Sequence, residues 1–188
     1  MSVVDNGGPV EELVAHAFFA HRPRLYACAL RVLGNREDAE EIVQDAIIRA
    51  CASWRKMTPQ RHSEMRLKSW LFTITLNLAR SQIRKRKRRA ALLSQDDAHF
   101  LGIGESVENA SSPPAMVERD IEVTLVRDAI NRLPPRLREP TWLHYVEDLS
   151  YPEIARILAQ PNGTVKSKVF RARALLRQTL APHRGLVH

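Results

Sequence analysis

The sequence predicts an all-α protein with two small helical domains joined by a flexible linker, the C-terminal domain being a helix-turn-helix. Apolar residues recur at helical spacing along most of the chain, and no alternating strand pattern occurs. A stretch rich in Gly, Ser and Pro and free of Lys and Arg separates two helical blocks. Near the C-terminus, a tight turn divides a short helical segment from a strongly basic one. We expect domains over residues 10–90 and 118–181, and the linker over residues 91–117.

The charge of the chain favours a polyanionic partner. The formal net charge is +8, which favours nucleic acid over a membrane surface. Residues 80–89 alone hold seven Lys and Arg side chains. A run of like charges is most often a solvated or disordered tail, but this run continues a predicted helix, which favours contact with nucleic acid.

No pattern in the sequence indicates a metal site, a cofactor or catalysis. Cys28 and Cys51 fall on apolar helix faces without CxxC spacing, so we expect core thiols rather than zinc ligands or a disulfide. No two histidines are four residues apart, and there is no Gly-rich phosphate loop or nucleophile elbow. The chain has no signal peptide and no long apolar run, so we expect a cytoplasmic protein without membrane insertion.

The N-terminal block contains one especially clear amphipathic helix. A helical pattern begins at Val10, and Pro23 either interrupts it or opens a second helix. After a stop signal at Gly34-Asn35, Arg36–Trp54 shows an apolar stripe and a strongly acidic first half, which suits the helix dipole.

One face of this helix carries a cluster of acidic and amide side chains. Asp38, Glu41 and Asp45 follow i, i+3, i+7 spacing, and Gln44 lies beside them. This pattern is typical of a solvated acidic face, and equally of a surface that docks a basic protein. The spacing does not decide between the two.

The basic run belongs to a long predicted helix, Leu67–Arg89, which follows a polar loop at Arg55–Arg66. Its apolar residues supply a core face and are Trp70, Leu71, Ile74, Leu78 and Ile83. Polar residues project from the other side and are Lys68, Asn77, Arg80 and Arg84. No apolar residue occurs from Arg84 to Arg89, so we expect this end to leave the core and contact solvent or phosphate.

The C-terminal block ends in the helix-turn-helix pattern, after helices expected at Glu118–Arg132 and around Leu137–Val146. Ser150 and Glu153 form a capping-box pattern, and Gln160–Gly163 breaks the helix that follows. A second helix restarts at Thr164. Its apolar residues face inward and are Val165, Val169, Ala172 and Leu176, and its cations cover the remaining surface and are Lys166, Lys168, Arg171, Arg173 and Arg177. The alternative is a helical hairpin with a solvated basic face.

Four segments together resemble the extracytoplasmic-function sigma factors of bacterial RNA polymerase, whose fold is two helical domains joined by a linker. Residues 38–45 look like the family's motif for docking on the polymerase clamp, and residues 70–84 resemble the helix that faces the promoter −10 element. Residues 129–134 resemble the start of region four, and residues 163–173 are similar to the −35 recognition helix. The four in this order are specific, whereas any one alone would be weak.

The resemblance implies a role for each polar surface. The residues that would dock on the polymerase are Asp38, Glu41, Gln44 and Asp45. The loop at Arg55–Arg66 would capture an unstacked −10 base. The residues that would follow the opened −10 strand are Lys68, Asn77, Arg80, Arg84 and Lys85. The residues that would meet the −35 duplex are Thr164, Lys166, Ser167, Lys168, Arg171 and Arg173. Phe170 would either touch a thymine methyl group or pack in the core.

The resemblance also implies the partners: core RNA polymerase, promoter DNA and an anti-sigma factor. The acidic linker would run through the polymerase towards the RNA exit path. A regulator that binds duplex DNA by itself is the main alternative, but the N-terminal half shows only helices, without the strands of a receiver or ligand domain. The sequence lacks the motifs that an enzyme would require. Its two basic DNA-facing helices argue against an anti-sigma or adaptor protein.

Overall fold

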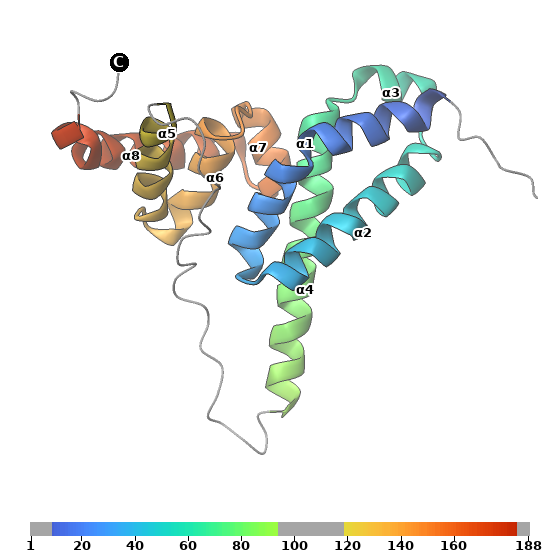
Figure 1. The fold of residues 1–188 in the computed structure, drawn as a ribbon, viewed down its shortest axis with the longest axis horizontal. Helices are drawn as coiled ribbons and strands as arrows, with labels where there is room; N and C mark the ends of the chain where they lie inside the picture. Colours follow the sequence, from blue (N-terminus) through green and yellow to red (C-terminus); the bar gives the residue numbers. More distant parts are fainter. Residues whose placement is uncertain (1–8, 94–118, 184–188) are drawn as a thin grey trace, which may run out of the picture. The chain divides into compact units, whose positions relative to one another are not determined.

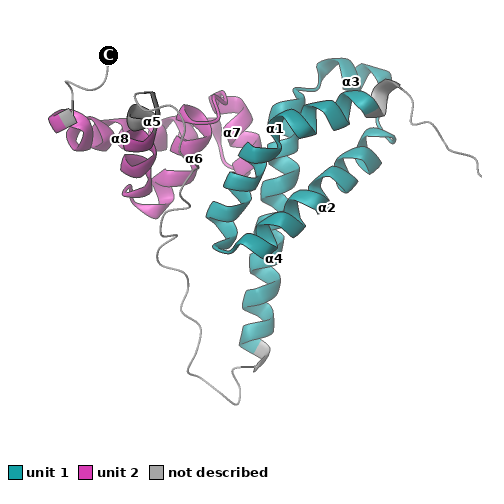
Figure 2. Ribbon diagram, in the orientation of Figure 1, with its two compact units in different colours: residues 1–109 teal, residues 110–188 magenta. Residues whose placement is uncertain are grey.

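The computed structural model describes residues 9–93 and 119–183, and within these ranges every regular element is a helix and none is a strand. The all-α prediction is therefore confirmed for the described part of the chain. The chain divides into two compact units, residues 1–109 and residues 110–188 (Figure 2). None of the described helices is both long and apolar enough to cross a membrane.

The first unit contains α1 (Pro9–Leu33), α2 (Arg36–Trp54), α3 (Pro59–Glu64) and α4 (Leu67–Leu93) (Figure 1). The three long helices α1, α2 and α4 pack against one another in pairs. The predicted stripe of α2 supplies much of this core, because Ala39, Ile42, Val43, Ala46 and Trp54 are all buried. The core face of α4 is centred on Leu71, Phe72, Leu76 and Ala79, while Trp70 and Ile74 are only half-buried.

Helix α1 passes through Pro23 as one continuous element, so the expected interruption does not occur. Figure 1 shows that the helix instead bends part-way along its length. A proline inside a helix removes one hydrogen bond and kinks the axis. Burial of Leu25, Cys28 and Ala29 immediately after Pro23 holds the second half of α1 against the core.

The loop predicted at Arg55–Arg66 contains the short helix α3, which the apolar pattern did not indicate. Pro59 occupies the first turn of α3, where its missing N–H group costs nothing, and Thr58 precedes it as the N-cap residue. None of the residues in α3 is buried, so the helix has no apolar stripe that periodicity could reveal. Its anchor is His62, whose ring stacks on Trp54 with centroids 4.0 Å apart and planes 8° from parallel.

Helix α4 extends to Leu93, past the predicted end at Arg89, because Ala90, Ala91, Leu92 and Leu93 are strong helix formers. The first three residues of the predicted linker at residues 91–117 are therefore helical. The remainder of that linker lies outside the described residues.

The second unit contains α5 (Arg119–Asn131), α6 (Pro135–Tyr145), α7 (Tyr151–Leu158), α8 (Asn162–Leu180) and the 3-10 turn η1 (Ala181–His183). A core cluster joins α5, α6 and α8 and comprises Ala129, Ile130, Leu133, Leu137, Trp142, Ala172 and Leu176. Helices α7 and α8 form the expected helix-turn-helix.

In the helix-turn-helix, the sequence predicted the cap of α7 correctly but not the exact position of the turn. The carboxylate of Glu153 accepts hydrogen bonds from the backbone N–H and the hydroxyl of Ser150, at 2.9 Å and 2.5 Å, so the predicted pairing of these two residues is confirmed. The turn, however, is made at Ala159, which adopts a left-handed conformation with φ of 50°. Asn162 and Gly163 already belong to α8, so they do not form the break that the sequence indicated.

The left-handed Ala159 generates a stability prediction. A left-handed residue with a side chain costs about 1–2 kcal/mol, a cost that glycine avoids. Ala159→Gly should therefore stabilise the second unit by about 1 kcal/mol, as measured by hydrogen exchange of the α7 and α8 amides. Ala155→Gly, inside α7, is the matched control and should destabilise by about 1 kcal/mol. Equal effects of the two variants would contradict the role of the turn.

Candidate nucleic-acid interface

Helix α8 separates an apolar inner face from a cationic outer face. Val165, Val169, Ala172 and Leu176 are buried, as predicted from their spacing. Most predicted site residues on α8 are exposed, namely Thr164, Lys166, Ser167, Arg171 and Arg173. The inner face fixes the helix by packing, so the outer face is presented on a rigid element.

Two residues of α8 behave differently from the simplest expectation. Lys168 is half-buried, and its Nζ donates a hydrogen bond to Oε1 of Gln160 at 2.8 Å, which ties α8 to the turn before it. Phe170 is 75% exposed, so the alternative that it packs in the core is wrong. An exposed aromatic ring among cations suits contact with a nucleic acid better than contact with water alone.

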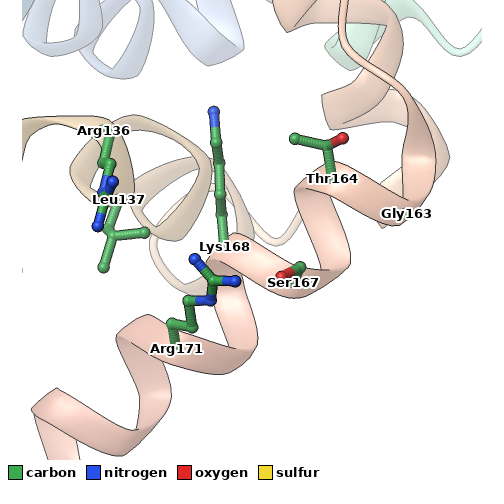
Figure 3. Close-up of a pocket in the computed structure, with 7 residues that line it drawn as sticks. All are labelled: Arg136, Leu137, Gly163, Thr164, Ser167, Lys168 and Arg171. Carbon is green, nitrogen blue, oxygen red and sulfur yellow. The ribbon is translucent and has the colours of Figure 1, made fainter.

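A pocket opens beside the outer face of α8 (Figure 3), and its one charged residue that was not among the sequence-predicted candidates is Arg136. Arg136 and Leu137 of α6 line it together with residues of the first turns of α8. Arg136 carries no local sequence signal, because a single Arg at a helix start is common on any solvated surface.

The second cationic surface lies on α4. Asn77, Arg84 and Lys85 are exposed, as expected from the sequence. Lys68 and Arg80 are half-buried and take part in interactions within the chain. His21 of α1 reports on the same region, because its partial burial, followed by the positive charges of Lys68 and Arg24, lowers its pKa. Burial disfavours the charged imidazolium form, and the two nearby cations lower the pKa of His21 in the same direction.

The loop between α2 and α4 is folded around Trp54. The ring of Trp54 lies between those of His62 and Trp70, with centroid distances of 4.0 Å and 5.6 Å. A ring nitrogen of His62, Nε2, is also 3.0 Å from the backbone carbonyl oxygen of Trp54. Stacking and hydrogen bonding together fix α3 against the C-terminal end of α2. The loop therefore has a defined shape although its own residues contribute little to the core.

Asp38 is set apart from the other three candidates on α2. Only 9% of its surface is exposed, and its carboxylate forms an ion pair with Arg86 of α4 and accepts a hydrogen bond from the Asn35 side chain. The Asp38 backbone N–H donates to Oδ1 of Asn35 at 2.8 Å, which caps α2. The expectation of one exposed face shared by all four residues is therefore corrected, because Asp38 is occupied inside the unit.

The remaining acidic face of α2 includes an apolar residue that sequence reasoning missed. Glu41 and Gln44 are exposed, and Asp45 is half-buried. Ile48 lies four residues after Gln44 on the same side of the helix and is 66% exposed. The sequence could have indicated this exposure, because Ile48 lies outside the apolar stripe of α2 that is buried. A single exposed apolar side chain is common on protein surfaces, and here it adds an apolar contact point to an otherwise polar face.

Comparison with known proteins identifies the family. Residues 17–89 match sigma-70 region 2, and residues 124–176 match sigma-70 region 4. The chain is 32% identical over 166 residues to the ECF RNA polymerase sigma factor SigW of Bacillus subtilis, covering 85% of this chain and 84% of that one. The chain belongs to the extracytoplasmic-function sigma factors. It is 30% identical over 165 residues to the RNA polymerase sigma-H factor of Pseudomonas aeruginosa, covering 86% and 83% of the two chains.

A solved structure shares the fold of this sigma factor. It is the sigma factor RpoE of Bartonella quintana in complex with the anti-sigma factor NepR. The similarity has a TM-score of 0.64 at 29% identity and covers 90% of this chain and 95% of that one. The protein is thus a sigma factor with the two regions that recognise the promoter −10 and −35 elements. All predicted DNA-contacting residues fall within the matched ranges.

The burial of Asp38 generates a prediction about the first unit. Asp38→Asn removes the charge that pairs with Arg86 and should destabilise the unit by about 1 kcal/mol, because the Asp38 side chain is only 12% exposed although the guanidinium stays solvated. Hydrogen exchange of the α2 and α4 amides measures this loss. Asp45→Asn removes the same charge from a less buried site and should change stability by less than about 0.5 kcal/mol. Equal stability of the two variants would contradict the structural role of Asp38.

Proposed function

We propose that this sigma factor uses three separate surfaces to bring core RNA polymerase to a promoter and open it. The observation that carries the proposal is the division of α8 into a buried apolar face and an exposed cationic face on a helix-turn-helix. The proposed domains are residues 10–90 and 118–181, which contain region 2 and region 4 respectively.

The first surface docks on the polymerase. It consists of Glu41, Gln44, Asp45 and Ile48 on the exposed side of α2. The acidic residues steer association with a basic partner, and Ile48 supplies an apolar contact at the C-terminal end of the surface. Asp38 supports this surface without being part of it. Its backbone N–H bonds to the capping residue Asn35, and its carboxylate pairs with Arg86, so both contacts fix the N-terminal end of α2.

The second surface follows the opened −10 strand. Asn77, Arg84 and Lys85 contact the strand from the exposed side of α4, and Lys68 and Arg80 contribute at its margin. The residues of the loop at 55–66 capture one flipped base, in the shape that His62 and Trp54 impose. Capturing a flipped base offsets part of the few kcal/mol that unstacking costs.

The third surface reads the −35 duplex. Lys166, Arg171 and Arg173 contact phosphates and base edges, with Thr164 and Ser167 as shorter polar contacts and Phe170 against a thymine methyl group. Lys168 fixes the turn through Gln160 and makes a weaker DNA contact than the other cations.

The same reasoning supports three further features of the proposal. The protein acts in the cytoplasm beside the polymerase, and it contributes specificity without an active site of its own. An anti-sigma factor holds it inactive, which is supported by the similar RpoE structure solved with NepR. Regulation by duplex binding alone is disfavoured, because such a protein has no use for the exposed face of α2.

The proposed function has a direct test. The purified chain, added to core polymerase and a genomic promoter library without any inhibitor, should produce transcripts that begin at a defined set of promoters. Sequencing their 5′ ends gives the −10 and −35 elements. Core polymerase without the chain is the control. Folded chain that binds core polymerase but gives no promoter-specific initiation would contradict the proposal.

Two pairs of substitutions separate the surfaces. Glu41→Lys with Asp45→Lys should weaken core binding by more than about tenfold, because both charges oppose the partner after reversal. Lys166→Ala with Arg171→Ala should preserve core binding but remove dependence on the −35 element. Core affinity and transcription from intact and scrambled −35 elements are measured for both. Loss of both properties in the second pair would indicate misfolding rather than lost recognition.

A further inference from the structure

The short helix α3, at one end of the first unit, is anchored there by the side chain of His62 (Figure 1). His62 is half-buried, whereas the other residues of α3 are all exposed. Among the described helices, none packs extensively against α3. Arg61 and His62 donate backbone hydrogen bonds to Thr58, within the same loop. The helix can therefore move as a piece when the contact of His62 is broken.

His62 makes two contacts with a single residue, Trp54. Its ring stacks on the indole, with centroids 4.0 Å apart and planes 8° from parallel. Its Nε2 lies 3.0 Å from the Trp54 carbonyl oxygen, and because a carbonyl oxygen can only accept, this nitrogen carries the proton and donates. Stacking on an aromatic side chain is also how nucleic-acid bases bind to proteins. The imidazole thus fills a place on the indole that suits a base.

Trp54 is the fixed member of this stack. Only 2% of its surface is exposed, and it belongs to the buried stripe of α2. Trp70, in the first turn of α4, lies beside it with ring centroids 5.6 Å apart and planes at 48°. We call Trp54 and Trp70 the aromatic corner. The corner is built on two long helices that pack against each other, so it stays in place when His62 moves.

The closed arrangement of the loop leaves one polar group unpaired. The indole Nε1 of Trp54 is buried and has no hydrogen-bond partner among the described residues. A buried donor without an acceptor is unfavourable, whereas a donor exposed to water finds one. This cost offsets part of the stabilisation that the stacking and the hydrogen bond of His62 provide. A partner that stacks better on Trp54 can therefore displace the imidazole.

A nucleobase is such a partner. The imidazole ring is smaller than any base, so a base overlaps more of the indole face. A base stacked on the outer face of His62 would instead rest on an exposed helix that no core residue supports. The structure therefore favours exchange of the imidazole for a base on Trp54 over addition of a base outside His62.

We propose that the His62 ring occupies, in the free chain, the place on Trp54 that a flipped −10 base takes in the open promoter complex. The inference rests on the proposed capture of a base by the loop at residues 55–66. The stacking contact is then autoinhibitory, because α3 must move away before the base can stack. Affinity for the opened strand is reduced in proportion to the fraction of chains in which α3 is closed.

The test uses holoenzyme assembled from the full chain and a promoter that it selects, with the −10 non-template strand left unpaired. The fluorescent base 2-aminopurine replaces one −10 base at a time, and its emission falls where it stacks on an aromatic ring. His62→Ala should bind the responding probe about fivefold more tightly than the wild type, the factor that corresponds to one aromatic stacking contact. The rate of the fluorescence loss should also rise, because opening of α3 no longer precedes stacking.

Two further variants and one measurement complete the design. His62→Gln retains a donor for the Trp54 carbonyl but has no ring, and should tighten binding as His62→Ala does. Gln60→Ala removes an exposed side chain from the same helix and should bind as the wild type does. Hydrogen exchange of the α2 and α4 amides in the free chain should be the same in all three variants. Faster exchange in both His62 variants would overturn the proposal, because His62 would then support the core.

The outcomes separate this inference from the function on which it rests. If no −10 position loses fluorescence with any of the chains, the proposed capture of a base fails. If one position loses fluorescence and both His62 variants bind more weakly than the wild type, the base stacks outside His62 and only the displacement proposal is overturned. Equal affinity of these variants and the wild type also overturns it, because the base then binds away from Trp54.

Discussion

The ion pair between Asp38 and Arg86 couples the two binding surfaces of the first unit. The Asn35 side chain caps the start of α2 and donates to the Asp38 carboxylate, which also holds a guanidinium from the basic end of α4. The pairing withdraws Asp38, whose side chain is only 12% exposed, from the acidic face of α2, whereas the Arg86 side chain remains 48% exposed. The neighbouring charges, Glu41 on one helix and Arg84 on the other, remain exposed for partners. The contact thus sets the geometry of both surfaces at once.

The second unit uses the same arrangement on a smaller scale. Nζ of Lys168 donates a hydrogen bond to Gln160 and holds the turn of the helix-turn-helix, while Arg171, three residues later, stays exposed. In each unit one polar contact fixes the scaffold and leaves its neighbours to bind. A charged residue next to a binding surface is therefore not always part of that surface. Its partner inside the chain decides which role it has.

Polar and apolar periodicity predicted the long helices and the inner face of α8 correctly, because burial of an apolar stripe follows directly from spacing. It failed for α3, whose short length and lack of buried residues leave no stripe. It located the break before α8 only in part, because Gln160 and Pro161 lie between the helices whereas Asn162 and Gly163 belong to α8. Glycine is the usual left-handed residue, but here Ala159 takes that conformation and Gly163 continues the helix. Packing of α7 against α8 overrides the local preference at Ala159.

The sequence by itself determined the all-α class, the two helical blocks, the amphipathic division of α8 and the resemblance to sigma factors. These features depend on residues close together in the chain. Only the tertiary structure decided which charges are free. Asp38 meets Arg86 across 48 residues, and Lys168 of α8 donates to Gln160 in the turn before it. Such pairings depend on how helices pack, and spacing within one helix carries no information about them.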